Sequence, residues 1–443
     1  MAESAERPIG SVDELAAYFS AAAKPRHAWR VGTEHEKIGI LLDSGAAVPH
    51  AGERSILALF HDLMQSKAWA PMLEGDDIIA LSRGSARITL EPGGQLELSG
   101  APHARLAETR EEISGHLAEL AEGSRRLGIA WLALGFRPLG TLEEVPWVPK
   151  GRYKIMREYL PTRGRLSLEM MKRTATVQAN IDFSDEEDAA RKLEAAMSVT
   201  SVVTALLANS PIVDGKDSGY ASYRARAWIE TDPDRCGLVP FVFEAGGDIF
   251  RRYVEWALDV PMFFVYRGRY IPARGMTFRR FLREGFAGER ATMADWELHV
   301  STLFPEVRLK QYIELRGADT GPLPFVYALP ALWKGLLYDD DACRGATSLL
   351  AHLSFDQRLA LREAVPLEGL RARVPKWGSV RDVARELLVL AHQGLARVAK
   401  DEESALTPLD EVVESGLAPA DRVRDAFHAA KGHLGQFIEA VRY

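Results

Sequence analysis

Alternation of polar and apolar residues marks two stretches of the chain as strands. Over residues 174–182, polar Thr, Gln, Asn and Asp alternate with apolar Ala, Val and Ile. Successive side chains of a β-strand point to opposite faces, so this stretch predicts a strand with one face on a core and the other on a polar environment. Residues 30–40 predict a second strand, on which Glu34 and Glu36 share one face.

Two glycine-containing turns divide residues 78–98 into further predicted strands. The runs before and after the turn Pro92-Gly93-Gly94 are short and alternating, which is typical of a hairpin. Such a hairpin places Glu91, Gln95 and Glu97 close together at its turn.

The second half of the chain has two more predicted strand regions. Residues 261–271 predict another hairpin, and residues 307–316 predict one continuous strand. On that strand, Tyr312, Glu314 and Arg316 share a face.

Helices are predicted between and after these strands. Ser11 followed by Glu14 is a capping-box pattern, which predicts a helix to about Ala23. Further helices are predicted over residues 53–65, 103–126 and 185–209. The apolar part of the last one, residues 195–213, is interrupted by polar residues and Pro211, which favours a buried helix over a membrane span.

From Pro322 onward the pattern is mostly helical, with breaks expected at four prolines: Pro366, Pro375, Pro408 and Pro419. No clean linker appears in the 443 residues. We therefore expect one catalytic domain over residues 1–443, with a sheet-rich core at about 28–320 and a mostly helical C-terminal portion at about 322–443.

Composition narrows the class of protein. Hydrophobic content is 47% and charged content 26%, which is ordinary for a soluble globular protein. The chain has 55 Lys and Arg against 62 Asp and Glu, so a global positive field for nucleic acid is not expected. Cys236 and Cys343 are its two cysteines, too few for a disulfide framework. Residues 1–8 lack an apolar stretch, so a cytoplasmic protein without a secretory signal is expected.

The polar strand faces carry the candidate chemistry. A pair such as Glu34 and Glu36 has two interpretations, a solvated strand face or a divalent-cation site. Solvated faces usually carry Lys and mixed charge, whereas these faces carry Glu, Gln, Asn and Thr. Converging carboxylates repel one another unless a cation lies between them, and hard cations such as Mg²⁺ prefer carboxylate oxygens. The predicted metal ligands are Glu34, Glu36, Glu91, Glu97 and Glu314.

A Mg²⁺ site of this kind indicates a nucleotide phosphate as a further ligand. Neither a G-x-x-x-x-G-K-[ST] loop nor a G-x-G-x-x-G turn opening a helix is present. We therefore expect ATP to bind on the sheet, held by metals and arginines. Arg316 is expected to stabilise charge on a transferring phosphoryl group, although an ordinary ion pair with a neighbouring Glu is the alternative. Arg152, Arg224 and Arg226 could each hold a substrate carboxylate, or each could be an ordinary structural arginine.

Four segments together resemble the plant-type glutamate–cysteine ligases, a family shared by plants and proteobacteria. The similarity runs in collinear order from about Ile9 to the C-terminus. The segments that carry it are VGTEHE (31–36), LEPGGQLELSGAP (90–102), MKRTATVQANIDF (171–183) and ELRGAD (314–319).

The resemblance implies an α+β fold similar to the catalytic domain of glutamine synthetase. That fold is a curved, mostly antiparallel sheet that forms a funnel and is backed by helices. The implied activity is ATP- and Mg²⁺-dependent ligation of the L-glutamate γ-carboxylate to the L-cysteine amine through a γ-glutamyl phosphate. This is the first step of glutathione biosynthesis. The implied partners are these small molecules, with no nucleic acid or membrane, in a monomer or homodimer.

The resemblance also implies roles for residues of this chain. The five carboxylates would hold about two or three Mg²⁺ ions. Arg316 and Glu314 are the expected catalytic residues, and Gln178 with Arg316 would contact the ATP phosphates. The expected substrate-binding residues are Arg152, Arg224, Thr176 and Asn180. Arg226 lies where the plant proteins differ, so no role is implied for it.

This sequence also differs from the plant proteins. A regulatory cysteine of the plant enzymes corresponds here to Ala273, and neither Cys236 nor Cys343 falls at a plant position. A plant-like disulfide switch is therefore not expected. A plastid transit peptide is not recognised, which leads us to expect a bacterial cytoplasmic enzyme. Two alternatives stay open: a γ-glutamyl ligase with another amine acceptor, and a non-catalytic nucleotide-binding relative.

Overall fold

The computed structural model describes residues 7–244, 246–286 and 288–443. Its centre is a nine-stranded sheet in the order β14-β15-β7-β1-β5-β4-β3-β2, with β6 pairing to the second half of β1. Every pairing within this sheet is antiparallel. The strands are β1 (Val31–Leu41), β2 (Ala70–Glu74), β3 (Asp77–Arg83), β4 (Ala86–Leu90), β5 (Leu96–Ser99), β6 (Ile129–Leu132), β7 (Val177–Ile181), β14 (Val307–Leu309) and β15 (Ile313–Leu315).

Helices in the first three quarters of the chain connect and flank these strands. They are α2 (Val12–Ser20), η1 (Arg26–Ala28), α3 (Ile56–Ser66), α4 (Leu106–Leu127), α5 (Gly151–Tyr159), η2 (Leu160–Thr162), α6 (Ser167–Arg173), α7 (Glu186–Leu206), α8 (Tyr223–Ile229), η3 (Pro240–Phe243), α9 (Ile249–Asp259), α10 (Phe278–Glu284) and α11 (Met293–Val300). Four two-stranded ladders complete the structure: β8 (Ile212–Val213) with β9 (Lys216–Asp217), β10 (Cys236–Gly237) with β13 (Phe304–Pro305), β11 (Phe264–Tyr266) with β12 (Tyr270–Pro272), and β16 (Arg373–Val374) with β17 (Gly378–Ser379).

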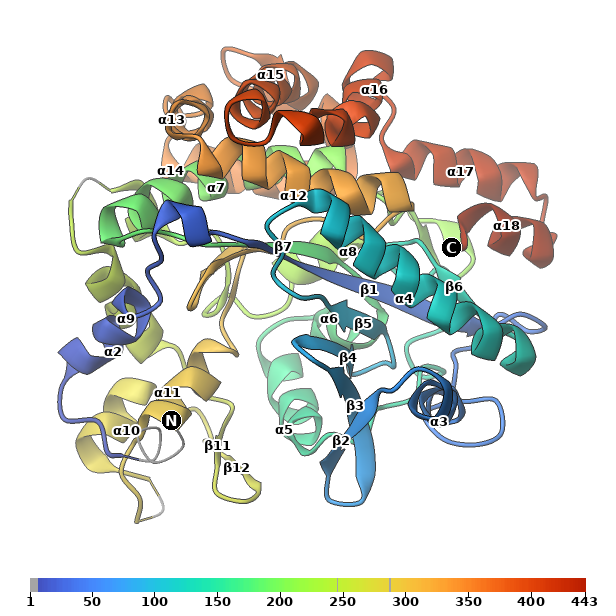
Figure 1. Cartoon of the computed structure of the whole chain (residues 1–443), viewed down its shortest axis with the longest axis horizontal. Helices are drawn as coiled ribbons and strands as arrows, with labels where there is room; N and C mark the ends of the chain where they lie inside the picture. Colours follow the sequence, from blue (N-terminus) through green and yellow to red (C-terminus); the bar gives the residue numbers. More distant parts are fainter. Residues whose placement is uncertain (1–6, 245, 287) are drawn as a thin grey trace.

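The last quarter of the chain is helical, as the sequence predicts, and lies together in the upper part of Figure 1. Its elements are α12 (Leu323–Tyr338), α13 (Asp340–Leu349), α14 (Phe355–Glu368), η4 (Gly369–Arg371), α15 (Val380–Val398), η5 (Lys400–Leu406), α16 (Thr407–Ser415), α17 (Pro419–Ala429) and α18 (Leu434–Val441).

Helices cover one face of the sheet and leave the other face to a cavity. Helix α12 packs on β7 and β1, α4 packs on β1, and α7 packs on β14 and β15 (Figure 1). The apolar residues of β7, Val177, Ala179 and Ile181, are fully buried against this layer. The predicted α+β class, with a mostly antiparallel sheet backed by helices, is confirmed.

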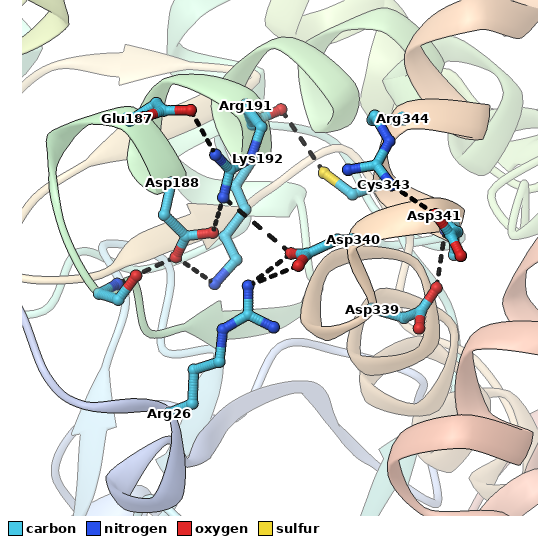
Figure 2. A network of polar contacts seen from close by, with 12 residues as sticks. Arg26, Glu187, Asp188, Arg191, Lys192, Asp339, Asp340, Asp341, Cys343 and Arg344 are labelled. Atoms are coloured by element: carbon cyan, nitrogen blue, oxygen red, sulfur yellow. Dashed lines mark hydrogen bonds and ion pairs between the residues drawn. The ribbon is translucent and has the colours of Figure 1, made fainter.

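An ion-pair network fastens the segment that precedes β1 to two helices of this layer (Figure 2). Arg26 of η1 donates to both carboxylate oxygens of Asp340 at 2.6 and 2.7 Å. On α7, the Lys192 ammonium lies 2.8 Å from Asp188 and 3.5 Å from the ring centroid of Trp29. Asp188 and Lys192 are both buried on α7, so the ion pair holds the Lys192 ammonium over Trp29, in the segment that leads into the central strand.

Three local predictions are wrong. Residues 307–316 form a hairpin, β14 and β15, because the chain reverses at residues 310–312 without Gly or Pro. Pro366 lies inside α14, where its carbonyl accepts from Ala221 and Ser222. Ser11 precedes α2, but its side chain makes no capping hydrogen bond to the helix. The Glu14 carboxylate accepts a hydrogen bond from Gly10 N instead of completing a capping box.

Pro375, Pro408 and Pro419 lie at or beside breaks between helices, as predicted. Pro408 and Pro419 lie in the first turns of α16 and α17, where a missing N–H costs nothing.

In the described part of the chain, no helix combines the length and apolarity that crossing a bilayer requires. The apolar stretch in α7 is buried in the core, as predicted.

Candidate active site

A cavity of about 610 Å³ opens on the uncovered face of the sheet. Strands β1, β4, β5, β7, β14 and β15 supply its floor, and α5 and α8 supply part of its wall. With the exception of Arg226, every site residue predicted from the sequence lines this one cavity. These residues are Glu34, Glu36, Glu91, Glu97, Glu314, Arg152, Arg224, Arg316, Thr176, Gln178 and Asn180.

Strand register brings the predicted carboxylates side by side. Glu36 of β1 stands opposite Glu97 of β5 in their antiparallel pair. On the other side of β1, Glu34 stands opposite Gln178 of β7. Since residues opposite each other on one face have Cβ atoms roughly 5 Å apart, these side chains are immediate neighbours.

Among the described residues, no Lys or Arg is in hydrogen-bond contact with the carboxylates of Glu34, Glu36 and Glu97, and Glu36 and Glu97 are buried. Glu36 accepts a hydrogen bond from Thr176 N at 2.9 Å, and Glu34 accepts one from Asn180 Nδ2 at 2.9 Å. Burial, with repulsion from Glu91 and Glu97, holds the pKa of Glu36 well above its usual range. Burial, with repulsion from Glu34 and Glu91, raises the pKa of Glu97 to about 8.

Glu314 differs from the other carboxylates because two arginines neutralise it. Arg308 Nη2 lies 2.7 Å from its carboxylate and Arg316 Nη1 lies 2.6 Å from it. Burial alone would raise the pKa of Glu314, but the two guanidinium groups bring this pKa below its usual range. Arg316 Nη1 also donates to Gln178 Oε1 at 2.9 Å, so one guanidinium links β15 to β7.

The predicted metal site is assembled only in part. Among the residues described, no three or more His, Cys, Asp or Glu side chains are grouped closely enough to hold a metal ion. The chemistry nevertheless fits a hard cation, because Glu36 and Glu97 are buried carboxylates whose raised pKa reports uncompensated negative charge. Glu314 fits less well, since arginines already satisfy its charge.

Two predicted arginines are held in the cavity wall with donors to spare. Arg224 of α8 is buried and donates from Nη2 to the carbonyl oxygen of Arg316 at 2.8 Å. Arg152 of α5 lies over the ring of Tyr153, its centre 5.1 Å from the ring centroid. In the described structure, Nε of each arginine is buried without a hydrogen-bond partner. A buried guanidinium with unused donors is suited to an anionic ligand.

Arg226 is excluded from the cavity. On the helix that carries Arg224, its side chain pairs instead with Glu230. Positions two apart on a helix point in different directions, so only one of the two arginines can face the cavity. The suggestion that Arg226 holds a substrate carboxylate is therefore wrong.

Further basic residues line the cavity that the sequence patterns did not single out: Lys24, Arg30, Arg87, Lys150, Arg308 and Lys310. Arg308 and Lys310 precede Glu314 and Arg316 by the same period of two, and that alternation was the signal that could have found them. Arg87, Thr89 and Glu91 also follow a period of two, along β4 and just beyond its end. This alternation was the signal that could have identified Arg87.

An antiparallel sheet whose uncovered face carries carboxylates, amides and arginines forms a site suited to small anionic substrates and cations. The model of glutamate–cysteine ligase family 2 matches residues 30–440, and the chain belongs to that family. The family predicted from the sequence is thereby confirmed.

Curated relatives support the same assignment, and a solved structure shares the fold. The chain is 43% identical over 433 residues to the chloroplastic glutamate–cysteine ligase of Brassica juncea, covering 97% of this chain and 83% of that protein. It is 44% identical over 428 residues to the Medicago truncatula enzyme, covering 96% and 83%. Its fold is similar to a glutamate–cysteine ligase of Francisella tularensis solved in complex with AMP, with TM-score 0.58, 13% identity and coverage of 93% and 87%.

The expected location is corrected by these comparisons. The matching plant relatives are chloroplastic enzymes, which contradicts the expectation of a bacterial cytoplasmic protein. Targeting signals are segments read by receptors, so the fold and the cavity residues carry no information about the compartment.

Proposed function

We propose that this chain joins the γ-carboxylate of L-glutamate to the amine of L-cysteine, with cleavage of ATP to ADP and phosphate. The enzyme class predicted from the sequence agrees with its family and with its curated relatives. The observation that carries the proposal is the single cavity in which buried carboxylates face arginines with unused donors. The proposed catalytic unit is the whole chain, with the sheet supplying the site and the C-terminal helices its backing.

The reaction requires an activated acyl group, because a carboxylate is a poor acyl donor at neutral pH. In the first step, an oxygen of the glutamate γ-carboxylate attacks the γ-phosphorus of ATP, and ADP leaves. In the second step, the cysteine amine attacks the acyl carbon, the bond to the phosphate oxygen breaks, and phosphate leaves with the amine losing a proton. The product is γ-glutamylcysteine.

Arg316 and Gln178 are the proposed contacts for the transferring phosphoryl group. A hydrogen bond of 2.9 Å joins Gln178 of β7 to Arg316, the residue that follows β15. The two strands are paired, and both side chains line the cavity. The Arg316 guanidinium lies near the rings of Trp228 and Phe304, 5.5 and 5.6 Å from their centroids. Fixed donors of this kind stabilise charge that develops during phosphoryl transfer.

Arg224 and Arg152 are the proposed contacts for the carboxylates of glutamate. Their buried, unpartnered Nε groups can be satisfied by an incoming anion, which an arginine binds in a bidentate manner. Thr176 is better explained as a support, since its hydroxyl donates to Ala318 O at 2.6 Å and its backbone N–H fixes Glu36.

Mg²⁺ is the proposed cation of the acidic part of the cavity. Glu36, Glu91 and Glu97 would hold it, with Glu34 as a neighbour, because burial raises the pKa of Glu36 and of Glu97 and the Glu91 carboxylate repels both. When bound, Mg²⁺ would neutralise phosphate charge and act as a Lewis acid.

The test is ADP release with purified protein, ATP and Mg²⁺. Glutamate is offered with cysteine and, in parallel, with a panel of other amines. Turnover that requires both glutamate and cysteine supports the proposal. Turnover with another amine in preference to cysteine would make the chain a γ-glutamyl ligase of different specificity, and ATP binding without turnover would make it a non-catalytic relative.

A further inference from the structure

Asp319 is a buried carboxylate just behind the cavity wall, outside the residues that line it. It lies four residues after the end of β15, on the segment that also contains Arg316. Its Oδ2 accepts hydrogen bonds from Asn209 N at 2.8 Å and from Ser210 Oγ at 2.6 Å. Its Oδ1 accepts one from Ser222 Oγ at 2.8 Å.

The two serine hydroxyls pass this constraint on to the start of α8. Ser210 Oγ accepts from the backbone N–H of Arg224 at 3.1 Å. Ser222 Oγ accepts from the backbone N–H of Ala225 at 3.0 Å and is the N-cap of the helix. Because each hydroxyl donates its proton to Asp319, its lone pairs are oriented toward the helix. One carboxylate therefore fixes both the position and the direction of the first turn of α8.

The segment that carries Asp319 is itself immobilised. Thr176 Oγ1 donates to Ala318 O at 2.6 Å, and Asn209 Nδ2 donates to Thr320 O at 2.8 Å. Gly135 packs against the Asp319 side chain so closely that a Cβ there would lie 2.5 Å from Asp319 Cγ. The carboxylate is consequently held by contacts that are independent of α8.

Arg224 is the residue of α8 that benefits from this arrangement. Its Nη1 lies 4.0 Å from Asp319 Oδ1, and its Nη2 donates to the carbonyl oxygen of Arg316. We propose that Asp319 is a positioning residue for glutamate binding: through Ser210 and Ser222 it presents Arg224 to the cavity in a fixed geometry. This inference rests on the proposed function for the identity of the ligand.

The test compares Asp319→Asn with Arg224→Ala and with the double variant in the full-length protein. Asn removes the charge and an acceptor oxygen while keeping the shape. Asp319→Asn should raise the glutamate KM about ten-fold or more and change kcat and the ATP KM by less than about three-fold. In the Arg224→Ala background it should have no further effect on glutamate KM, because the carboxylate acts through that arginine. Additive effects in the double variant would overturn the proposal.

A matched control separates positioning from general destabilisation. Asp188 is also a buried aspartate at the start of a helix, with a hydrogen bond from Ser184 N and an ion pair to Lys192, but neither of these partners lines the cavity, unlike Arg224. Asp188→Asn should lower the melting temperature and leave the glutamate KM at the wild-type value. Ser210→Ala and Ser222→Ala, milder changes, should each raise the glutamate KM about three-fold.

Amide hydrogen exchange gives a readout that does not depend on turnover. In Asp319→Asn, amide exchange at residues 223–229 should be faster than in the wild type, while exchange in α7 stays unchanged. In Asp188→Asn, exchange at residues 223–229 should stay at the wild-type rate. Unchanged protection of residues 223–229 in Asp319→Asn would overturn the positioning role whatever the substrate is. If the wild-type protein fails to ligate glutamate, the proposed function fails, while the exchange measurement still decides the role of Asp319.

Discussion

Glu36 of β1 and Glu97 of β5 lie directly opposite each other across an antiparallel strand pair, and both line the cavity. Burial and neighbouring carboxylates raise the pKa of both, that of Glu97 to about 8. Such a pair is costly in a protein without a cation, since like charges repel strongly when desolvated. The cavity is therefore built at the expense of stability, which is expected where an anionic site must receive a metal.

The first prediction follows from this cost. Glu97→Gln keeps the shape of the side chain and removes its charge, so it should stabilise the metal-free protein by about 1 kcal/mol or more. The melting temperature in chelator should rise by about 2 °C or more, while Mg²⁺-dependent turnover falls at least about ten-fold. Thermal unfolding and ADP release measure the two effects.

Two further variants make this result interpretable. Glu34→Gln should also lower turnover, because Glu34 lines the cavity beside the same cluster and its carboxylate repels that of Glu97. Glu187→Gln is the control, since its side chain is 85% exposed on the surface of α7 and should change neither quantity. Full turnover of folded Glu97→Gln would remove that residue from the set of metal ligands.

The second prediction concerns pH in the absence of metal. The pKa of Glu97 is about 8 in the folded protein and 4.5 in the reference state, so between these values the folded state binds a proton that the unfolded state has lost. Stability therefore falls as pH rises from about 5 to 8 and levels off above that range. Denaturant unfolding in chelator at a series of pH values measures this slope, which Glu97→Gln should reduce. If the stability of the wild type instead rises over the same pH range, and that of Glu97→Gln does not, the raised pKa assigned to Glu97 is wrong.

Strand alternation was sufficient to predict much of the site. The shared face of Glu34 and Glu36, and the hairpin that brings Glu97 beside them, follow from a period of two and a Gly-Gly turn. At that turn Gly94 has φ +80°, and a Cβ on Gly93 would lie 2.1 Å from Lys172 O, so the turn accepts no other residue without rearrangement. Local sequence therefore carries this part of the fold.

Other parts of the site depend on contacts that no local pattern reports. Arg152 and Arg224 enter the cavity from short helices, α5 and α8, for which the alternation gave no prediction. Helix α8 begins where it does because Asp319 holds its cap, almost a hundred residues further along the chain. The hairpin that pairs Arg308 with Glu314 was missed because the reversal at residues 310–312 lacks Gly and Pro. Tertiary packing decided these elements, and a single sequence does not show it.

The third prediction is that activity is almost indifferent to thiol reductants. Cys343 is buried on α13, and burial raises the pKa of the thiols of both Cys343 and Cys236 to about 12. Because the thiolate is the reactive form, both should oxidise slowly at neutral pH. Neither cysteine forms a disulfide in the part of the chain described, and Ala273, which the resemblance leads us to expect in place of a plant regulatory cysteine, is buried.

The measurement compares turnover after incubation with dithiothreitol or with oxidised glutathione. Cys236→Ser and Cys343→Ser are the variants that complete it, and each should retain wild-type activity under both conditions. A large and reversible loss on oxidation that either variant abolishes would show a redox switch in this chain.

The last prediction separates phosphoryl transfer from the holding of glutamate. Arg316 Nη1 donates to both Glu314 and Gln178, and a lysine ammonium lacks the planar fork needed to keep both contacts while facing a phosphate. Arg316→Lys should therefore lower kcat at least about ten-fold and change the glutamate KM by less than about three-fold. Arg224→Lys should mainly raise the glutamate KM and change kcat little, because a bidentate carboxylate contact is made in ground and transition states alike. Steady-state kinetics with glutamate varied at saturating ATP and cysteine distinguish the two. If Arg316→Lys raises only the glutamate KM and Arg224→Lys lowers only kcat, the two roles are reversed.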